Sequence, residues 1–164
     1  MRPLFSVCFL FSAACASDAA DPADSDDLPG TLVSEVPPTT ARDLRAWLDE
    51  GAYLDWAAES APHASAGPHF GDVQTYVNAA FEAAALAGDT HPVGSASVKE
   101  LFGSGDTVLG HAVMVKVAPG TAADSWYWFE RYQGNNFANG EGDPLCVDCH
   151  VAGNDHVLTP FPLQ

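Results

Sequence analysis

The chain has 164 residues, in which 22 acidic side chains stand against 6 basic ones, so its formal net charge is −16. This length is enough for one domain. A folded surface this acidic repels nucleic acids and anionic membranes, and we therefore expect no nucleic-acid partner.

The N-terminus has the pattern of an export signal. Arg2 is followed by an apolar stretch over residues 4–11 that is too short to span a bilayer, and then by small residues. Two cleavage sites stay open: a lipoprotein-type signal over residues 1–15, with Cys15 lipidated, and an ordinary cut after Ala16. We favour the first. Either predicts an extracytoplasmic protein, in the periplasm or held at the outer membrane by its lipid alone.

Residues 16–39 follow as a predicted disordered acidic tether, because Asp, Pro, Ala and Ser bury too little apolar area to offset the entropy of ordering. The remaining residues, 40–164, form the predicted domain. Its first helix begins after Thr40 as N-cap, with Asp43 at the third position, and ends near Gly51. Residues 53–56 predict a second short helical turn, and the Pro- and Gly-containing stretch 62–69 a loop.

Alternating apolar and polar residues predict four strands, over residues 72–78, 95–102, 107–117 and 125–132. An Ala-rich helix over 79–87 follows the first strand. The turn 103–106 joins the second and third strands into a hairpin. The Gly- and Asn-rich stretch 133–144 predicts a loop. The fold class is therefore α+β, with a mainly antiparallel sheet and a few helices.

Near the C-terminus, Cys146-Val147-Asp148-Cys149-His150 forms a C-x-x-C-H motif, the pattern of a haem c attachment site. Two thiols one helical turn apart can form thioethers to the two haem vinyl groups, and His150 can then ligate the iron. An exported chain suits this cofactor. Cys8 lies in the leader, so attachment at Cys146 and Cys149 and lipidation of Cys15 would account for every remaining thiol.

Three other interpretations of the motif are weaker. A zinc site would need further ligands, such as His156, and no second C-x-x-C is present. A thioredoxin-like redox pair would need a preceding βαβ unit. A structural disulfide leaves the adjacent His150 unexplained.

The order of several segments resembles the cytochrome P-460 family, whose relatives include cytochrome c prime-beta. These segments are Val98-Lys99-Glu100-Leu101, Val113-Met114-Val115-Lys116, Trp126-Tyr127-Trp128, the C-x-x-C-H motif and residues 154–159. The resemblance spans residues 44–162. It implies a mainly antiparallel β fold, usually a homodimer, with a five-coordinate haem c that has an open distal face. P-460 members carry a lysine bonded to the macrocycle and oxidise hydroxylamine; the c prime-beta relatives lack this bond and bind nitric oxide.

Lys99 stands where the resemblance places the cross-linking lysine. On the strand over 95–102, Ser97 and Lys99 share one face while Ala96 and Val98 take the other. An amine held against haem is desolvated, so its pKa falls and its nucleophilic form becomes accessible. Lys99 is therefore a candidate for both cofactor binding and catalysis. The plain alternative is a lysine whose amine reaches solvent.

Glu141 lies near the position of the family's distal carboxylate, and we expect it to transfer protons to or from a bound ligand. An exposed acid on a polar loop is the alternative. Some members place an arginine in the distal pocket where this chain has Gln74, which carries no charge. That difference moves weight from an oxidase towards a ligand-binding protein.

Three functions follow from these features. The first is oxidation of hydroxylamine or a related small nitrogen species, with a redox partner cytochrome accepting the electrons. The second is nitric oxide binding without turnover, in which Phe137 lines the distal side. The third is electron transfer, in which Met114 or His111 supplies a sixth iron ligand. The loop histidines His63, His69 and His91 are given no role.

Overall fold

The computed structural model describes residues 36–164. Its helices are α1 (Ala41–Asp49), α2 (Ala79–Ala87) and α3 (Pro144–His150), with a 3-10 turn at Ala123–Ser125. Its strands are β1 (Ala57–Ala58), β2 (His63–Ala64), β3 (Asp72–Val77), β4 (Ala96–Phe102), β5 (Val108–Lys116), β6 (Trp126–Tyr132) and β7 (Asn135–Glu141). The predicted export signal, Cys15 and residues 16–35 of the tether lie outside the described residues. No helix within 36–164 is long and apolar enough to cross a membrane.

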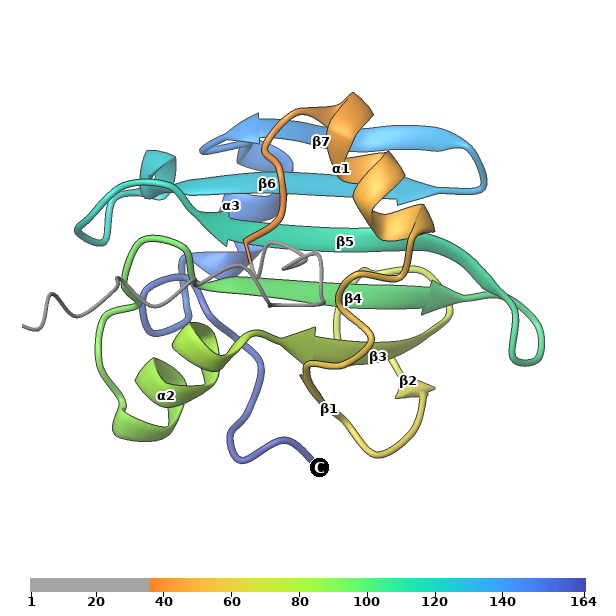
Figure 1. Ribbon diagram of the computed structural model, residues 1–164, viewed down its shortest axis with the longest axis horizontal. Helices are drawn as coiled ribbons and strands as arrows, with labels where there is room; N and C mark the ends of the chain where they lie inside the picture. The colour runs from red at the N-terminus through yellow and green to blue at the C-terminus, as the bar shows by residue number, and fades with distance from the viewer. Residues whose placement is uncertain (1–35) are drawn as a thin grey trace, which may run out of the picture. The chain divides into compact units, whose positions relative to one another are not determined.

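The strands form one antiparallel sheet in the order β1, β3, β4, β5, β6, β7, with β2 also paired to β3. This confirms the predicted α+β class with a mainly antiparallel sheet. Figure 1 shows α1 crossing in front of the central strands and α3 behind them. The two faces of the sheet are therefore covered by different parts of the chain.

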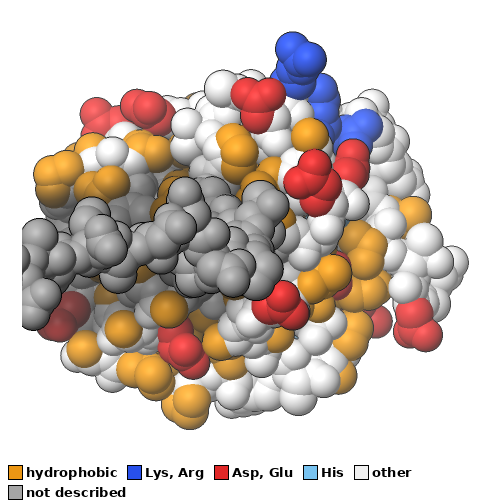
Figure 2. All heavy atoms as spheres, viewed as in Figure 1, with side chains coloured by type: hydrophobic (Ala, Val, Ile, Leu, Met, Phe, Trp, Pro, Cys, Tyr) orange, Lys and Arg blue, Asp and Glu red, His pale blue; other side chains and the backbone are white. Residues whose placement is uncertain are grey.

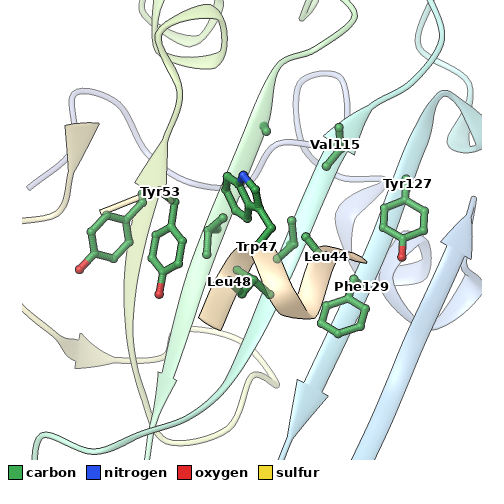
Figure 3. Close-up of a cluster of buried hydrophobic side chains, with 11 residues drawn as sticks. Leu44, Trp47, Leu48, Tyr53, Val115, Tyr127 and Phe129 are labelled. Carbon is green, nitrogen blue, oxygen red and sulfur yellow. The ribbon is translucent and has the colours of Figure 1, made fainter. Parts of the chain in front are cut away.

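Helix α1 begins as predicted, because the Thr40 side chain accepts a hydrogen bond from the Asp43 N–H. Its buried face consists of Leu44, Trp47 and Leu48. These side chains pack against the residues of β3 to β6 that point towards α1, including Tyr76, Val98, Val113, Val115, Tyr127 and Phe129 (Figure 3). This cluster is the main core, and it fixes which side chains each strand turns away from α1.

The opposite face of the sheet packs against α2, α3 and the C-terminal residues. Its apolar cluster contains Val77, Phe81, Met114, Trp126 and Trp128, with Cys146, Val147, Phe161 and Leu163 against them. Asn78 ends β3 and caps α2, since its side-chain oxygen accepts from the Phe81 N–H at 3.0 Å. The C-x-x-C-H motif thus lies against the sheet face that carries the indoles of β6.

Two predictions about local structure were wrong. The stretch 133–144 contains β7, because Gln133 (φ 48°) and Gly134 (φ 85°) form a tight turn that returns the chain along β6. Asn and Gly have a weak propensity for strands, and the backbone hydrogen bonds to β6 stabilise the strand in spite of it. The predicted loop 62–69 contains the short strand β2, which pairs with β3. Residues 53–56 form a hydrogen-bonded turn, as predicted, and lead directly into β1.

Figure 2 shows acidic side chains spread over the face that carries α1, with basic side chains gathered at one edge. Lys99 and Lys116 contribute little to the surface, because Lys116 is buried and Lys99 is mostly enclosed. The other basic side chains of residues 36–164 are Arg42, which is exposed, and Arg45 and Arg131, which are half-buried.

Candidate functional site

A cavity of about 360 Å³ opens on the sheet face that packs against α3. Its wall combines strand residues, the loop before β3, the C-x-x-C-H helix and the segment after it. The lining includes Glu59, His63, His69, Lys99, Met114, Trp128, Glu130, Phe137, Cys146, Cys149 and His150. This volume is within the range of small-molecule and cofactor sites.

The floor of the cavity is set by the register of four strands. Thr75, Lys99, Ala112 and Glu130 are directly paired from β3 to β6, so all four project from the same face. Lys99 and Glu130 are two strands apart, roughly 10 Å between backbones. The methyl side chain of Ala112 between them leaves space above the sheet. An amine and a carboxylate are thus held across a gap from each other.

His150 lies at the end of α3, and a backbone oxygen of the following turn orients its imidazole ring. Nδ1 of His150 is 2.8 Å from the backbone oxygen of His156. A carbonyl can only accept, so Nδ1 carries the proton and Nε2 is the nitrogen with a free lone pair. Metal-ligating histidines commonly have this arrangement. His156 therefore supports the motif through its backbone.

The turn that presents the His156 carbonyl is held in an unusual conformation. Asp155 and His156 have φ angles of 47° and 66°, in the left-handed region that non-glycine residues seldom occupy. The Asp155 carboxylate is fixed by Lys116 Nζ at 2.7 and 2.9 Å, by Trp126 Nε1 at 3.2 Å and by the His91 N–H at 2.9 Å. This buried network, which we call the Lys116–Asp155 network, anchors the turn to β5 and β6.

Cys146 and Cys149 are free thiols that line the cavity, the first partly buried and the second exposed. Burial raises the pKa of Cys146 to about 12, and the charges of Glu130 and Asp143 act in the same direction. A reactive redox thiol is instead stabilised as a thiolate. The surroundings of Cys146 therefore disfavour a reactive redox pair.

Lys99 projects into the cavity, and Ser97 shares its face, as the strand alternation predicts. Burial lowers the pKa of Lys99, and the carboxylates of Glu59 and Glu130 oppose this shift. An amine in this position is more readily deprotonated than an exposed lysine. The described structure thus places Lys99 among the side chains that would contact a ligand in the cavity.

Three residues considered at the sequence level stand elsewhere. Glu141 is exposed at the end of β7 and does not line the cavity. Gln74 is on the opposite face of β3 from Val73 and Thr75, and its amide donates to the Glu59 backbone oxygen at 2.7 Å. His111 also faces away, with Nε2 3.0 Å from the Tyr53 hydroxyl. None of the three is positioned to contact a ligand in the cavity as the structure stands.

Met114 and Phe137 do line the cavity. Met114 is buried between Val77, Trp126 and Trp128, so its side chain packs within the apolar cluster. Phe137 is 43% exposed and lies at the rim, with its ring 5.1 Å from that of Phe70. Phe137 therefore lines the cavity, and its place on the distal side of a haem stays a prediction.

Sequence reasoning missed two pairs in the cavity wall. His69 Nδ1 is 3.1 Å from Glu130 Oε2, and His63 Nε2 is 3.2 Å from Glu59 Oε2. The second pair has an i, i+4 spacing that a search of the sequence could have found. The first joins a loop to a strand about 60 residues later, so only the fold reveals it.

No protein-family model matches the sequence, and no curated protein is significantly similar to it. The function must therefore be argued from the residues that the fold brings together.

These residues fit a covalently attached haem. Two thiols and one imidazole, all from α3, line a single cavity, and the imidazole already has its non-ligating nitrogen bonded to a carbonyl. The wall between them is largely apolar, as a buried macrocycle requires. Cys146 and Cys149 would hold the macrocycle, and Nε2 of His150 would bind the iron.

Proposed function

We propose that the protein is an exported c-type haem protein that binds and oxidises hydroxylamine or a related small nitrogen species. The observation that carries this proposal is the His150 Nδ1 to His156 carbonyl contact of 2.8 Å beside two free thiols on the cavity wall. The resemblance of the segments around Lys99 and the C-x-x-C-H motif to the cytochrome P-460 family supports the same conclusion. Bound haem iron would supply the redox centre to which the small ligand binds.

In this proposal the chain has three tasks. Cys146 and Cys149 would hold the macrocycle, and His150, at the end of α3, would ligate the iron. Lys99, with its pKa lowered by burial, supplies an amine that is readily deprotonated and would contact the macrocycle. The Asp155 turn keeps the His150 ring in one orientation.

Proton transfer is assigned to the His69–Glu130 pair in preference to Glu141. Removing electrons from hydroxylamine also releases protons, and an acceptor must lie within reach of the ligand. Glu130 is 11% exposed at its side chain and lines the cavity, with His69 next to it. Glu141 stays a prediction, but its position outside the cavity gives it no support.

Nitric oxide binding without turnover is the second candidate. It is favoured by the aromatic rim that Phe70 and Phe137 form, with Tyr132 stacked on Phe70 at 4.6 Å. Rings at the mouth of a site restrict entry to small ligands and exclude water. Electron transfer through a Met114 ligand has less support, because that side chain is packed among Val77, Trp126 and Trp128.

Absorption spectra of the mature exported protein test the proposal. We expect a haem spectrum that persists after unfolding in alkaline pyridine, and that is lost as a covalent product in a C146A/C149A double variant. Hydroxylamine should then be consumed in the presence of an electron acceptor, and slowed about 100-fold by Glu130→Gln. Glu141→Gln is the matched control.

A protein without covalently attached haem would overturn the proposal. Attached haem with nitric oxide binding but no hydroxylamine consumption would support the second candidate. Equal loss of activity in the Glu130 and Glu141 variants would contradict the assignment of Glu130.

A further inference from the structure

His69 and His150 lie close together in the cavity wall, although the two come from different parts of the fold. His69 belongs to the loop between β2 and β3, and His150 ends α3. Their ring centroids are 6.3 Å apart with an interplanar angle of 71°. Both side chains line the same cavity. The fold thus brings two imidazoles together over a space that the proposed cofactor would enter.

The separation agrees with two imidazoles that share one metal ion. A metal–imidazole bond is about 2 Å long and the ring nitrogen lies about 1 Å from the ring centre, so two opposed ligands have centroids about 6 Å apart. An edge contact between two rings can have the same spacing. The spacing alone therefore does not distinguish a shared metal from simple packing.

The partners of the two rings do distinguish them. Each imidazole has an acceptor at Nδ1: the His156 carbonyl for His150, at 2.8 Å, and Glu130 Oε2 for His69, at 3.1 Å. The second is an ion-pair contact without the alignment of a hydrogen bond. In both rings Nε2 remains as the nitrogen that can bind a metal. A carboxylate or a carbonyl behind the ring is the usual support of a ligating histidine.

His63, in the same loop region, provides a direct contrast. Its Nε2 is 3.2 Å from Glu59 Oε2, its Nδ1 is 3.0 Å from the Ala64 backbone oxygen, and half of its side chain is exposed. Both ring nitrogens are thus occupied by acceptors. The side chain of His69 is 15% exposed. Of these two cavity histidines, only His69 has the environment of a ligand.

We propose that His69 is the second axial ligand of the haem, opposite His150, with Glu130 as the residue that positions it. This rests on the proposed function, because it needs haem attached at Cys146 and Cys149. His69 would then occupy the face of the haem that the family resemblance leaves open, and a small ligand would have to displace it before binding. The displaced imidazole stays beside Glu130, where the pair can accept a proton.

His69 lies in a loop, a location that suits an iron ligand that can dissociate. It follows Pro68 in a connecting segment, residues 65–71, that contributes no strand to the sheet. Residues 66–68 are exposed. Movement of this loop breaks none of the strand pairs that hold Lys99 and Glu130 in place.

Absorption and electron paramagnetic resonance spectra of the full mature protein test the inference. We expect a low-spin ferric haem in the unmodified protein and a high-spin one in His69→Ala, returned to low spin by added imidazole. His69→Gln serves as a second variant that keeps the volume of the side chain. His63→Ala is the matched control and should stay low-spin.

Carbon monoxide binding to the ferrous protein gives a second readout. In the unmodified protein the observed rate should reach a limit as the gas concentration rises, because departure of His69 becomes rate-limiting. His69→Ala should remove the limit and raise the apparent affinity about tenfold or more.

The outcomes separate this inference from the proposed function. Attached haem that is high-spin in the unmodified protein would overturn the role of His69 and leave the haem proposal standing. A low-spin spectrum that persists in both His69 variants would also overturn it, and would point to Met114. Absence of attached haem after unfolding in alkaline pyridine would overturn both.

Discussion

The Lys116–Asp155 network makes the strongest single prediction about stability. Lys116→Met keeps the apolar stem of the side chain and removes its charge. Lys116 Nζ donates to both Asp155 oxygens and to Ser125 Oγ, at 2.7, 2.9 and 3.0 Å, and lies 4.8 Å from the Trp126 ring centre. Both charged side chains are fully buried. The substitution therefore leaves a carboxylate without its counter-charge in the interior.

Breaking one side of such a buried pair costs about 3–5 kcal/mol. With a urea dependence of about 1–3 kcal/mol per molar, the unfolding midpoint should fall by about 2 M at an unchanged slope. Urea unfolding followed by circular dichroism measures this shift. Arg42→Met, on the exposed side of α1, is the control and should change stability by less than about 0.5 kcal/mol.

A double variant, Lys116→Met with Asp155→Asn, shows whether the two residues act together. Removing both charges should cost less than the sum of the single substitutions, because neither leaves the other unpaired. A loss below about 1 kcal/mol for Lys116→Met alone would refute the reasoning, since it would mean that Asp155 is accommodated without its ion pair.

Two further predictions concern buried ionisable groups. Burial lowers the pKa of His111 from 6.5 to about 4, so the folded state keeps it neutral while the unfolded chain takes up a proton. Its contribution is present above pH 6.5 and is lost as the pH falls towards 4, by at most about 3 kcal/mol. His111→Gln should flatten urea midpoints across this range; an unchanged slope would contradict it. Lys99 is predicted to be bonded to the macrocycle, so digestion and mass spectrometry should find its peptide joined to that of Cys146. Two separate peptides would exclude the bond.

Much of the fold could be predicted because its signals are local. Thr40 caps its helix through a side chain three residues from its partner, and strand alternation placed Lys99 on the cavity face. Strand β7 was missed because its stability comes from pairing with β6 rather than from its own Asn- and Gly-rich composition. The functional site also has a part that local sequence predicts and a part that depends on pairing between distant segments.

The C-x-x-C-H motif is contiguous, so its spacing alone indicates its chemistry. The rest of the cavity wall depends on register. Glu130 is aligned with Lys99 through Ala112, and a shift of one residue in either pairing would turn it to the α1 face. His69 is brought in by a loop with no periodic pattern. These placements depend on contacts between distant segments, which a single sequence does not display.

Helix α3 contains no fully buried residue, and Leu145, Cys149 and Val151 at its surface are exposed. The sheet and α1 form their core without it, so we expect the chain to fold without a cofactor, with α3 as its most easily opened element. In the proposed haem protein, covalent attachment during maturation would stabilise the docked position of α3. It would link the helix to the sheet through a ligand that both surround, and local opening of α3 would slow once the cofactor is in place.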